Sequence, residues 1–299
     1  MSKKFRIIGI GEILWDVFPT GKQLGGAPAS FAYHVSAQGN EGIIISRIGN
    51  DELGNGVINC LKGVGLVTDY IQIDGNKPTG TVEVKIDDSN QPDYIIKEDV
   101  AWDFLEWSPD FKLLLKSVDA VCFGTLSQRN IVSRQTILKF LSGVKNDIVK
   151  ILDINLRQNF FNEQVIEESL RLSDILKLNS SELEILGKLL EINEKYDEKD
   201  LCIFLISKYK IKLICLTKGE EGSILINENS FHESPAYPYL VVDRVGAGDA
   251  FTAAMIIQFL KGNSLDIIND YANKLASWVT SKSGGMPIYD SDIRNIMNL

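Results

Sequence analysis

A glycine-rich turn that runs directly into a long apolar segment dominates the last third of the sequence. The turn occupies residues 243–249, and residues 250–260 behind it are apolar on nearly every face. A segment of that length and character predicts a fully buried helix. The β-branched run at residues 240–242, ahead of the turn, predicts the end of a strand. Strand, tight turn and buried helix together indicate an α/β fold.

The same turn has the chemistry of an anion site. Gly246 and Gly248 carry no Cβ, so the unpaired N–H groups of the first helical turn can face an anion. Phosphoryl transfer needs such a site and a base for the attacking hydroxyl, and Asp249 lies in position to be that base. The positive end of the helix dipole predicts that Asp249 stays ionised and is a weak base. The alternative is a plain glycine turn with Asp249 as a helix cap, because short glycine motifs have many false positives.

Charge and composition exclude several classes of function. With 299 residues and 44% hydrophobic content, the chain can bury a sizeable core. Its 40 acidic residues outnumber 31 basic ones, and the net charge of −9 argues against nucleic-acid binding. Glu12 and Asp16 break the first apolar run and no run is long enough to cross a bilayer, so we expect a cytoplasmic protein without a signal peptide. Four scattered cysteines and two histidines leave little material for a metal site or a catalytic triad.

The rest of the chain alternates between short apolar runs and helical segments. Buried strands are predicted at residues 5–10, 43–48, 120–123, 149–153, 175–177 and 213–217. Helical patterns stand between most of them, and another helix is expected over residues 264–281. We therefore expect a single α/β domain over residues 1–299, with a mostly parallel sheet between layers of helices.

An insert at about residues 68–105 interrupts this alternation. Short alternating strands are predicted between residues 70 and 97, a pattern typical of a small antiparallel sheet. With part of residues 12–24, the insert is expected to form a β-lid. Trp102 closes the insert, and packing between insert and body is favoured over ligand stacking as its role.

Polar residues collect where the parallel strands end, which is the edge of such a sheet that binds ligands. They follow the strands at residues 149–153, 175–177 and 213–217. The candidates at this edge are Asn155, Arg157, Asn179, Glu182, Thr217, Gly219 and Gly222. Turn chemistry is the alternative explanation for the last three, and a capping box with Asn179 is the alternative for Glu182.

Two longer motifs and three shorter ones together resemble those of the ribokinase-type (PfkB) carbohydrate kinases, and within that family most resemble the fructokinases. Gly-Gly-Ala-Pro-Ala at residues 25–29 is similar to the N-terminal family signature, and residues 243–249 are similar to the C-terminal one. Three further matches are Pro-Thr-Gly-Thr-Val at 78–82, Asn-Ser-Ser-Glu at 179–182 and Ala-Asn at 272–273. The match covers nearly the whole chain and implies a three-layer α/β/α sandwich of ribokinase type, with a β-lid over the sugar.

The resemblance also implies roles for individual residues. Asp249 would deprotonate a primary hydroxyl of the sugar, and Gly246, Ala247 and Gly248 would hold the transferred phosphoryl group. The implied sugar site consists of Asp16, Gly25, Gly26, Ser30, Asn155, Arg157 and Trp102. The implied ATP contacts are Asn179, Thr217, Gly219, Gly222 and Asn273. Glu182 would place Mg²⁺ through water, and Asp243 and Val245 would help to bind a monovalent cation, K⁺.

One departure from the family pattern bears on the substrate. Ser30 stands where the first signature usually ends in asparagine, so the contact to the sugar must change. ATP-dependent phosphorylation of fructose is expected. The alternatives are a 2-keto-3-deoxygluconate kinase, with Arg157 or Arg129 on the acid group, then a ribokinase or nucleoside kinase, and a sugar-sensing protein without catalysis. A homodimer formed through the lid is also expected, with no nucleic-acid or membrane partner.

Overall fold

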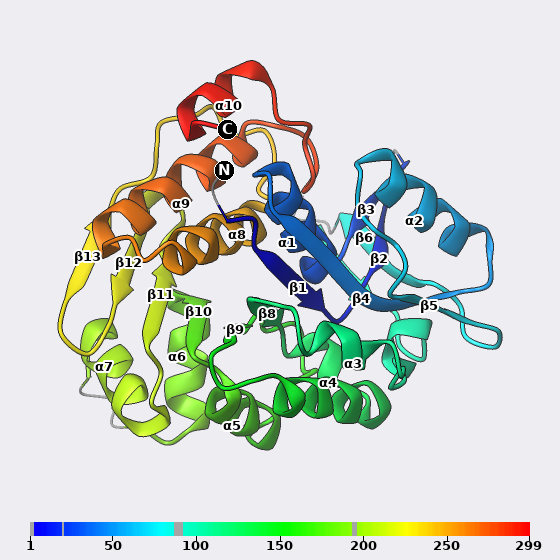
Figure 1. Cartoon of the computed structure of the whole chain (residues 1–299), viewed down its shortest axis with the longest axis horizontal. Coiled ribbons are helices and arrows are strands. Elements are labelled where there is room, and N and C mark those ends of the chain that lie inside the picture. Colours follow the sequence, from blue (N-terminus) through cyan, green and yellow to red (C-terminus); the bar gives the residue numbers. More distant parts are fainter. Residues whose placement is uncertain (1–2, 20, 87–91, 193–195) are drawn as a thin grey trace.

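The structure, a computed structural model, describes residues 3–19, 21–86, 92–192 and 196–299. Its centre is a nine-stranded, mostly parallel sheet (Figure 1). Only the pairs β11/β12 and β12/β13 are antiparallel. In spatial order the strands are β13 (Phe231–Ser234), β12 (Ser223–Ile226), β11 (Leu213–Thr217), β10 (Ile175–Asn179), β9 (Val149–Asp153), β8 (Ala120–Phe123), β1 (Arg6–Ile10), β4 (Glu41–Gly49) and β5 (Ile71–Asp74).

Helices cover both faces of this sheet (Figure 1). One layer contains α1 (Ala27–Ala37), α8 (Ala247–Leu260), α9 (Leu265–Thr280) and α10 (Ser291–Met297). The opposite layer contains α3 (Phe111–Leu114), α4 (Ile131–Gly143), α5 (Glu163–Leu172), α6 (Ser180–Leu189) and α7 (Glu198–Tyr209). Helix α2 (Glu52–Gly63) lies near the lid, and short 3₁₀ turns occur at η1 (Ala101–Phe104), η2 (Leu126–Gln128) and η3 (Gly219–Glu221). The three-layer α/β/α architecture is the predicted one.

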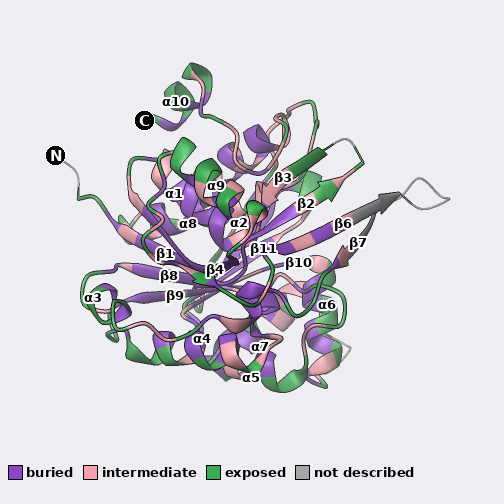
Figure 2. Ribbon diagram, turned by 90° about the vertical axis from the view of Figure 1, so that its right-hand side faces the viewer, coloured by how far each residue is buried: buried purple, intermediate pink, exposed green. Residues whose placement is uncertain are grey.

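The central strands are buried on both faces because they carry consecutive apolar residues, with few charged residues such as Lys177 on β10 among them. Ile7 packs into the cluster of buried side chains under α1 and α8, whereas Ile8 packs into the cluster under α4 to α7. Figure 2 shows the same division, with buried strands in the centre and exposed residues on the outer helix faces. This is the pattern expected of a parallel sheet covered on both sides.

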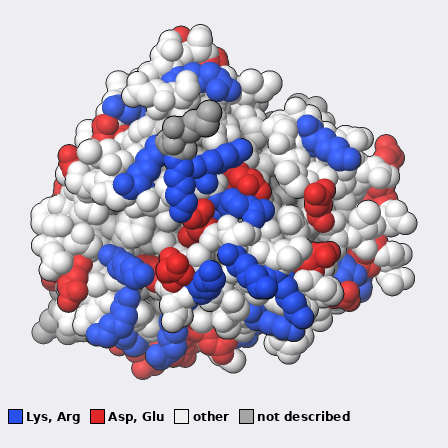
Figure 3. All heavy atoms as spheres, in the orientation of Figure 1, with Lys and Arg blue, Asp and Glu red and all other residues white. Residues whose placement is uncertain are grey.

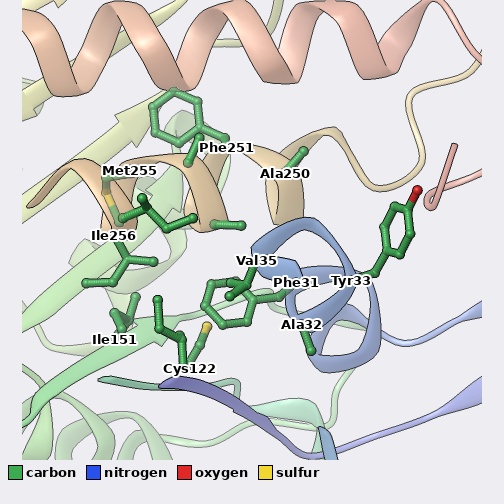
Figure 4. Packing of buried hydrophobic residues seen from close by; sticks show 14 of the residues in the cluster. Phe31, Ala32, Tyr33, Val35, Cys122, Ile151, Ala250, Phe251, Met255 and Ile256 are labelled. Atoms are coloured by element: carbon green, nitrogen blue, oxygen red, sulfur yellow. The ribbon is translucent and has the colours of Figure 1, made fainter. Parts of the chain in front are cut away.

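Helix α8 is the buried helix that the apolar segment predicts. Every residue from Ala250 to Gln258 is buried. Its small side chains, such as Ala253 and Ala254, allow α1 and α9 to approach, and Phe251 and Ile256 fill the space around them (Figure 4). Burying each large apolar side chain stabilises the fold by roughly 1.5–3 kcal/mol.

The lid is a second, four-stranded sheet in the order β3 (Gly21–Gly25), β2 (Leu14–Phe18), β6 (Gly80–Ile86) and β7 (Pro92–Ile96). Residues 14–18 and 21–25 belong to it, and the pairs β2/β3 and β6/β7 are antiparallel as expected, but two details differ from the prediction. Strand β5 pairs with β4 at the edge of the main sheet and is not part of the lid. The pair β2/β6 is parallel, so the lid is a mixed sheet.

The strand predicted at residues 240–242 is also wrong. This segment carries no strand, and Leu240 is 85% exposed. A β-branched run forms a strand only where a neighbouring strand can pair with it, and none does here among the described residues.

No helix within the described ranges is both long and apolar enough to span a bilayer. Basic and acidic side chains are interspersed over the face shown in Figure 3.

Candidate active site

The first turn of α8 begins at a glycine whose conformation and surroundings exclude a side chain. Gly246 has φ +77°, and a Cβ there would lie 2.4 Å from Cα of Gly285. Gly248, two residues on, lies so close to Lys177 that a Cβ would sit 3.0 Å from Nζ. The backbone of this turn is therefore open on one side, with a lysine ammonium at its border. This is a geometry that favours an anion.

Asp249 lies in this turn and is only partly exposed. Burial raises the pKa of its carboxyl to about 7, and the negative charge of Asp153 adds to the effect. Lys177 and the Ser30 hydroxyl act in the opposite direction, but do not cancel it. The helix dipole argument, which predicts a weak base, is thus overruled by burial and by a second carboxylate. A carboxyl with this pKa can accept a proton at neutral pH.

Three charged residues near Asp249 were not nominated from the sequence. Glu12, after β1, is a buried carboxyl whose pKa burial raises. Asp153 ends β9 and forms a buried ion pair with Lys177 of β10, with Oδ1 and Nζ 3.0 Å apart. Burial acts to lower the pKa of Lys177, but its acidic neighbours outweigh burial and the lysine keeps its charge. The sequence feature that could have identified these three residues is a charged side chain within or just after a strand predicted to be buried, because charged residues are rarely buried.

Asp16 marks the sugar end predicted for the site. It lies on β2 of the lid, and Gly25 lies on the neighbouring strand β3. A Cβ at Gly25 would lie 2.3 Å from Oδ2 of Asp16, so the glycine makes room for this carboxylate. Gly26 has φ +104°, and a Cβ there would meet the backbone oxygen of Glu12 at 2.6 Å. Burial raises the pKa of Asp16 to about 6, against the nearby positive charge of Arg157.

Ser30 links helix α1 to the loop behind the anion hole. It is buried, and its Oγ donates a hydrogen bond of 3.1 Å to the carbonyl of Gly285. His34, one turn later, lies 2.9 Å from the same carbonyl through Nε2 and 2.9 Å from the Tyr289 hydroxyl through Nδ1. A neutral ring satisfies both contacts, donating from Nε2 and accepting at Nδ1. These bonds hold the backbone that packs against Gly246.

His34 should make stability depend on pH. Burial lowers its pKa from an ordinary 6.5 to about 4, so between these values the unfolded chain binds a proton that the folded protein excludes. Stability from this group is fully present above pH 6.5 and is lost as the pH falls toward 4, by about 3 kcal/mol. Urea unfolding of wild type and His34→Gln at several pH values measures it. A free energy of unfolding that falls equally in both proteins would contradict the assignment.

The remaining residues predicted for the sugar site separate into two groups. Asn155, in a left-handed conformation with φ +43°, and the exposed Arg157 follow β9, and the charge of Arg157 acts on Asp16. Trp102 is only 1% exposed, and the guanidinium of Arg129 stacks on its ring at 4.0 Å. This burial agrees with the packing role that the sequence favoured, and a contact between Trp102 and the sugar stays a prediction. Arg129 is held in turn by Asp103, with Nε and Oδ1 2.7 Å apart, so two of its guanidinium nitrogens already have partners and it is the less available arginine for a substrate acid group.

At the predicted magnesium position, Asn179 and Glu182 form the capping box of α6. Asn179 Oδ1 accepts from the N–H of Glu182 at 2.8 Å, and Glu182 Oε2 accepts from the N–H of Asn179 at 2.9 Å. Glu182 Oε1 accepts a third bond, from the N–H of Leu156 at 3.0 Å. Burial raises the pKa of this carboxyl, although Lys177 opposes the rise. The capping interpretation is confirmed, and a magnesium role stays a prediction.

The residues predicted to contact ATP have local structural explanations as well. Gly219 and Gly222 have φ of +60° and +97°, which a turn between β11 and β12 requires. Thr217 donates to the carbonyl of Leu178 at 3.3 Å. Asn273 is buried, and its Nδ2 donates to Ser223 Oγ at 2.8 Å. With its amide held in this way, Asn273 serves the packing of α9 on β12.

Asp243 joins the two loops predicted to hold a monovalent cation. Its Oδ1 accepts from the N–H of Val245 at 3.0 Å, and its Oδ2 accepts from the N–H of Gly284 at 3.0 Å. Within the described ranges, no group of three or more His, Cys, Asp or Glu side chains is placed to hold a metal ion.

Two cavities, of about 500 and 230 Å³, lie away from Asp249. One lies against the ends of α1 and α2, and the other lies beside Phe160.

A carboxyl with a raised pKa beside a glycine turn open to an anion, on a covered α/β sheet with a second small sheet, is the arrangement expected of a kinase that phosphorylates a small alcohol. The chain belongs to the pfkB family of carbohydrate kinases, whose family model matches residues 11–291. It is therefore a sugar kinase, a transferase of phosphate.

The relatives and solved structures agree with this assignment. A sugar kinase of Pyrococcus horikoshii is 31% identical, over 93% of this chain and 91% of that protein. The crystal structure of that protein superposes with a TM-score of 0.82, covering 97% of this chain and 96% of that one. A second crystal structure, of the same protein in complex with ATP, superposes with a TM-score of 0.79. A probable fructokinase of Arabidopsis thaliana is 25% identical, over 94% of this chain and 93% of that protein.

Proposed function

We propose that the protein transfers the γ-phosphoryl group of ATP to the primary hydroxyl of a furanose, with fructose as the first substrate. The observation that carries the proposal is Asp249, with a pKa of about 7, in the same helical turn as the backbone of Gly246 and Gly248. The Pyrococcus horikoshii relative, solved with ATP, supports the donor. The Arabidopsis relative, with its fructokinase name, supports the acceptor.

The proposed reaction is a single in-line step. The sugar oxygen forms a bond to the γ-phosphorus while the bond from that phosphorus to the β-phosphate oxygen breaks, and ADP leaves. Asp249 accepts the proton of the hydroxyl. The N–H groups of the turn after Gly246 and the ammonium of Lys177 face the negative charge on the phosphoryl oxygens. No covalent enzyme intermediate is needed.

We propose that Mg²⁺ binds with the ATP phosphates near the acidic residues at this edge of the sheet, where it would neutralise phosphate charge. Mg²⁺ usually keeps several waters and takes one or two carboxylates together with phosphate oxygens. Glu182 already accepts backbone N–H bonds at both oxygens, so we propose contact through water. For K⁺, the loops that Asp243 joins would supply backbone carbonyls, including that of Val245. Omitting each ion from the assay tests its requirement.

The sugar is identified by a screen. Sugar-dependent ADP release would be measured with fructose, ribose, 2-keto-3-deoxygluconate and nucleosides at equal concentration. We expect the largest kcat/KM for fructose. A larger value for any other compound would reject fructose, and ADP release that no compound increases would reject the kinase function in favour of a sugar sensor.

One observation favours 2-keto-3-deoxygluconate as the second candidate. Arg157 is exposed and its charge acts on Asp16, so it is a candidate partner for a substrate carboxylate, whereas Arg129 is held by Asp103. Arg157→Gln discriminates between the two sugars. If the acid sugar is the substrate, this change raises its KM at least about tenfold, since a charge-assisted pair is lost. If fructose is the substrate, its KM changes little.

Sugar binding should weaken at acidic pH. The pKa of Asp16 is raised to about 6, and only the ionised carboxylate can accept hydrogen bonds from two hydroxyls at once. We therefore expect the KM for the sugar to rise as the pH falls below about 6, while the KM for ATP stays nearly constant. Asp16→Asn should show a high KM without this dependence on pH. An unchanged KM for the sugar between pH 7 and pH 5 in the wild type would count against the role of Asp16.

We propose that the lid forms the interface of a homodimer. Its strands β2 and β6 carry partly exposed side chains such as Val17, and sheets with an open face are commonly covered by a second copy. Light scattering at micromolar concentration should give a mass twice that of one chain. The mass of a single chain would refute the dimer.

A further inference from the structure

Asp153 occupies a junction between the sheet and the catalytic helix. It is the last residue of β9 and only 5% exposed. Oδ1 accepts from Nζ of Lys177, its register partner on β10, at 3.0 Å. Oδ2 accepts from Oγ1 of Thr252, on α8, at 3.2 Å. One carboxylate therefore ties β10 to the first turns of α8.

Both partners of Asp153 lie close to Gly248, the last glycine of the turn, which directly precedes Asp249 in the chain. The hydroxyl of Thr252 also donates toward the carbonyl oxygen of Gly248 at 2.9 Å, so its one proton is shared between that oxygen and Oδ2 of Asp153. The ammonium of Lys177 lies 3.0 Å from the position of a Cβ on Gly248. A substitution at Asp153 would therefore alter the contacts of both Thr252 and Lys177 with the turn that carries Asp249.

We propose that Asp153 is a positioning residue for the phosphoryl transfer, which fixes the catalytic turn through Thr252 and, together with Lys177, sets the charge beside that turn. This inference rests on the proposed function, because it takes Asp249 to be the base that accepts the proton of the sugar hydroxyl. The inference extends the site to Asp153 and Thr252, which lie outside the glycine turn.

The charges around Asp249 give the two partners opposite effects. Asp153 raises the pKa of Asp249, and Lys177 lowers it. Glu12, on the side of β1, also raises it. The Cys122 thiol of β8 stays neutral, because burial raises its pKa well above the ordinary value. Glu182, on α6, acts on Lys177 and so reaches Asp249 only indirectly.

The test is a pair of substitutions with opposite expected results. Asp153→Asn should move the acid limb of kcat/KM against pH to lower pH, and Lys177→Met should move it to higher pH. A neighbouring charge shifts a pKa by about 1–3 units, so each displacement should be measurable. Shifts in the same direction, or no shift while kcat falls, would reduce Asp153 to a structural residue and overturn the proposal.

Breaking a buried ion pair can unfold a protein, so a milder pair of variants accompanies the first. Thr252→Val keeps the shape of the side chain and removes the hydroxyl, whereas Thr252→Ser keeps the hydroxyl. We expect Thr252→Val to lower kcat by about tenfold, as a slight misplacement of reacting groups does, with both KM values nearly unchanged. Thr252→Ser should stay close to wild type. Equal kcat values in the two variants would contradict the proposal.

A readout without turnover separates this inference from the proposed function. NMR of protein labelled at the aspartate carboxyl carbons, with Asp249→Asn to assign the signal, follows the titration of Asp249 directly. A signal that shifts in opposite directions in Asp153→Asn and Lys177→Met supports the charge balance even if no sugar is phosphorylated. A titration that is the same in both variants and wild type would overturn it even if the kinase activity is established.

Discussion

Replacing Asp249 with asparagine should lower kcat by about a thousandfold, which is within the range that a positioned general base contributes. The amide has nearly the same shape as the carboxylate but cannot accept the proton of the attacking hydroxyl. Initial rates of sugar-dependent ADP release, with both substrates saturating, measure the effect. Because burial and Asp153 disfavour the charge of Asp249, the variant should be at least as stable as the wild type in thermal unfolding.

Asp266→Asn is the matched control for this substitution. Asp266 lies in the first turn of α9, as Asp249 lies in the first turn of α8, but its side chain is exposed and far from the glycine turn in sequence. The control should keep the wild-type kcat. If Asp249→Asn retained a kcat close to that of the control, Asp249 would not be the base.

Gly246→Ala should lower kcat by roughly 100-fold, the loss typical of removing an oxyanion donor. A Cβ at this position would lie 2.4 Å from Cα of Gly285, so one of two backbones must move. The left-handed conformation, with φ +77°, adds roughly 1–2 kcal/mol of strain for a residue with a Cβ. Both effects would displace the N–H groups that we propose face the phosphoryl oxygens.

Gly262→Ala separates strain from displacement. Gly262 has nearly the same conformation, with φ +75°, but no atom lies within 4 Å of its Cβ position. It should lose stability from strain alone and keep its kcat. The two variants would be compared by urea unfolding and by steady-state kinetics. A Gly246→Ala protein with the kinetics of Gly262→Ala would show that the turn at Gly246 does not hold the phosphoryl group.

Most of the fold follows from local patterns in the sequence. The mainly apolar runs at β1, β4, β8, β9, β10 and β11 predict buried strands, and the segment after Asp249 predicts the buried helix α8. The run at residues 240–242 has the same composition but finds no partner strand. Pairing is a property of the whole sheet, so composition cannot decide it, and the same reason explains why β5 was assigned to the lid.

The residues proposed for the site are easiest to nominate where they belong to one continuous motif, and harder to nominate where they meet only through folding. Gly246 and Asp249 belong to a continuous motif. Asp153 and Lys177 meet only because β9 and β10 are adjacent and in register, which the sequence does not state. The same packing raises the pKa of Asp249, which the helix dipole alone predicts to stay low.

The central claim is that a carboxylate and a glycine-lined turn transfer a phosphoryl group to a primary alcohol. Phosphorus NMR of the purified protein with ATP, Mg²⁺ and fructose tests this directly, because it identifies the product. We predict a phosphomonoester signal that splits into a triplet in the proton-coupled spectrum, as a phosphate on a CH₂ carbon requires. The signal should be absent when Asp249→Asn replaces the wild type over the same time. A spectrum in which only inorganic phosphate and ADP appear would contradict the account.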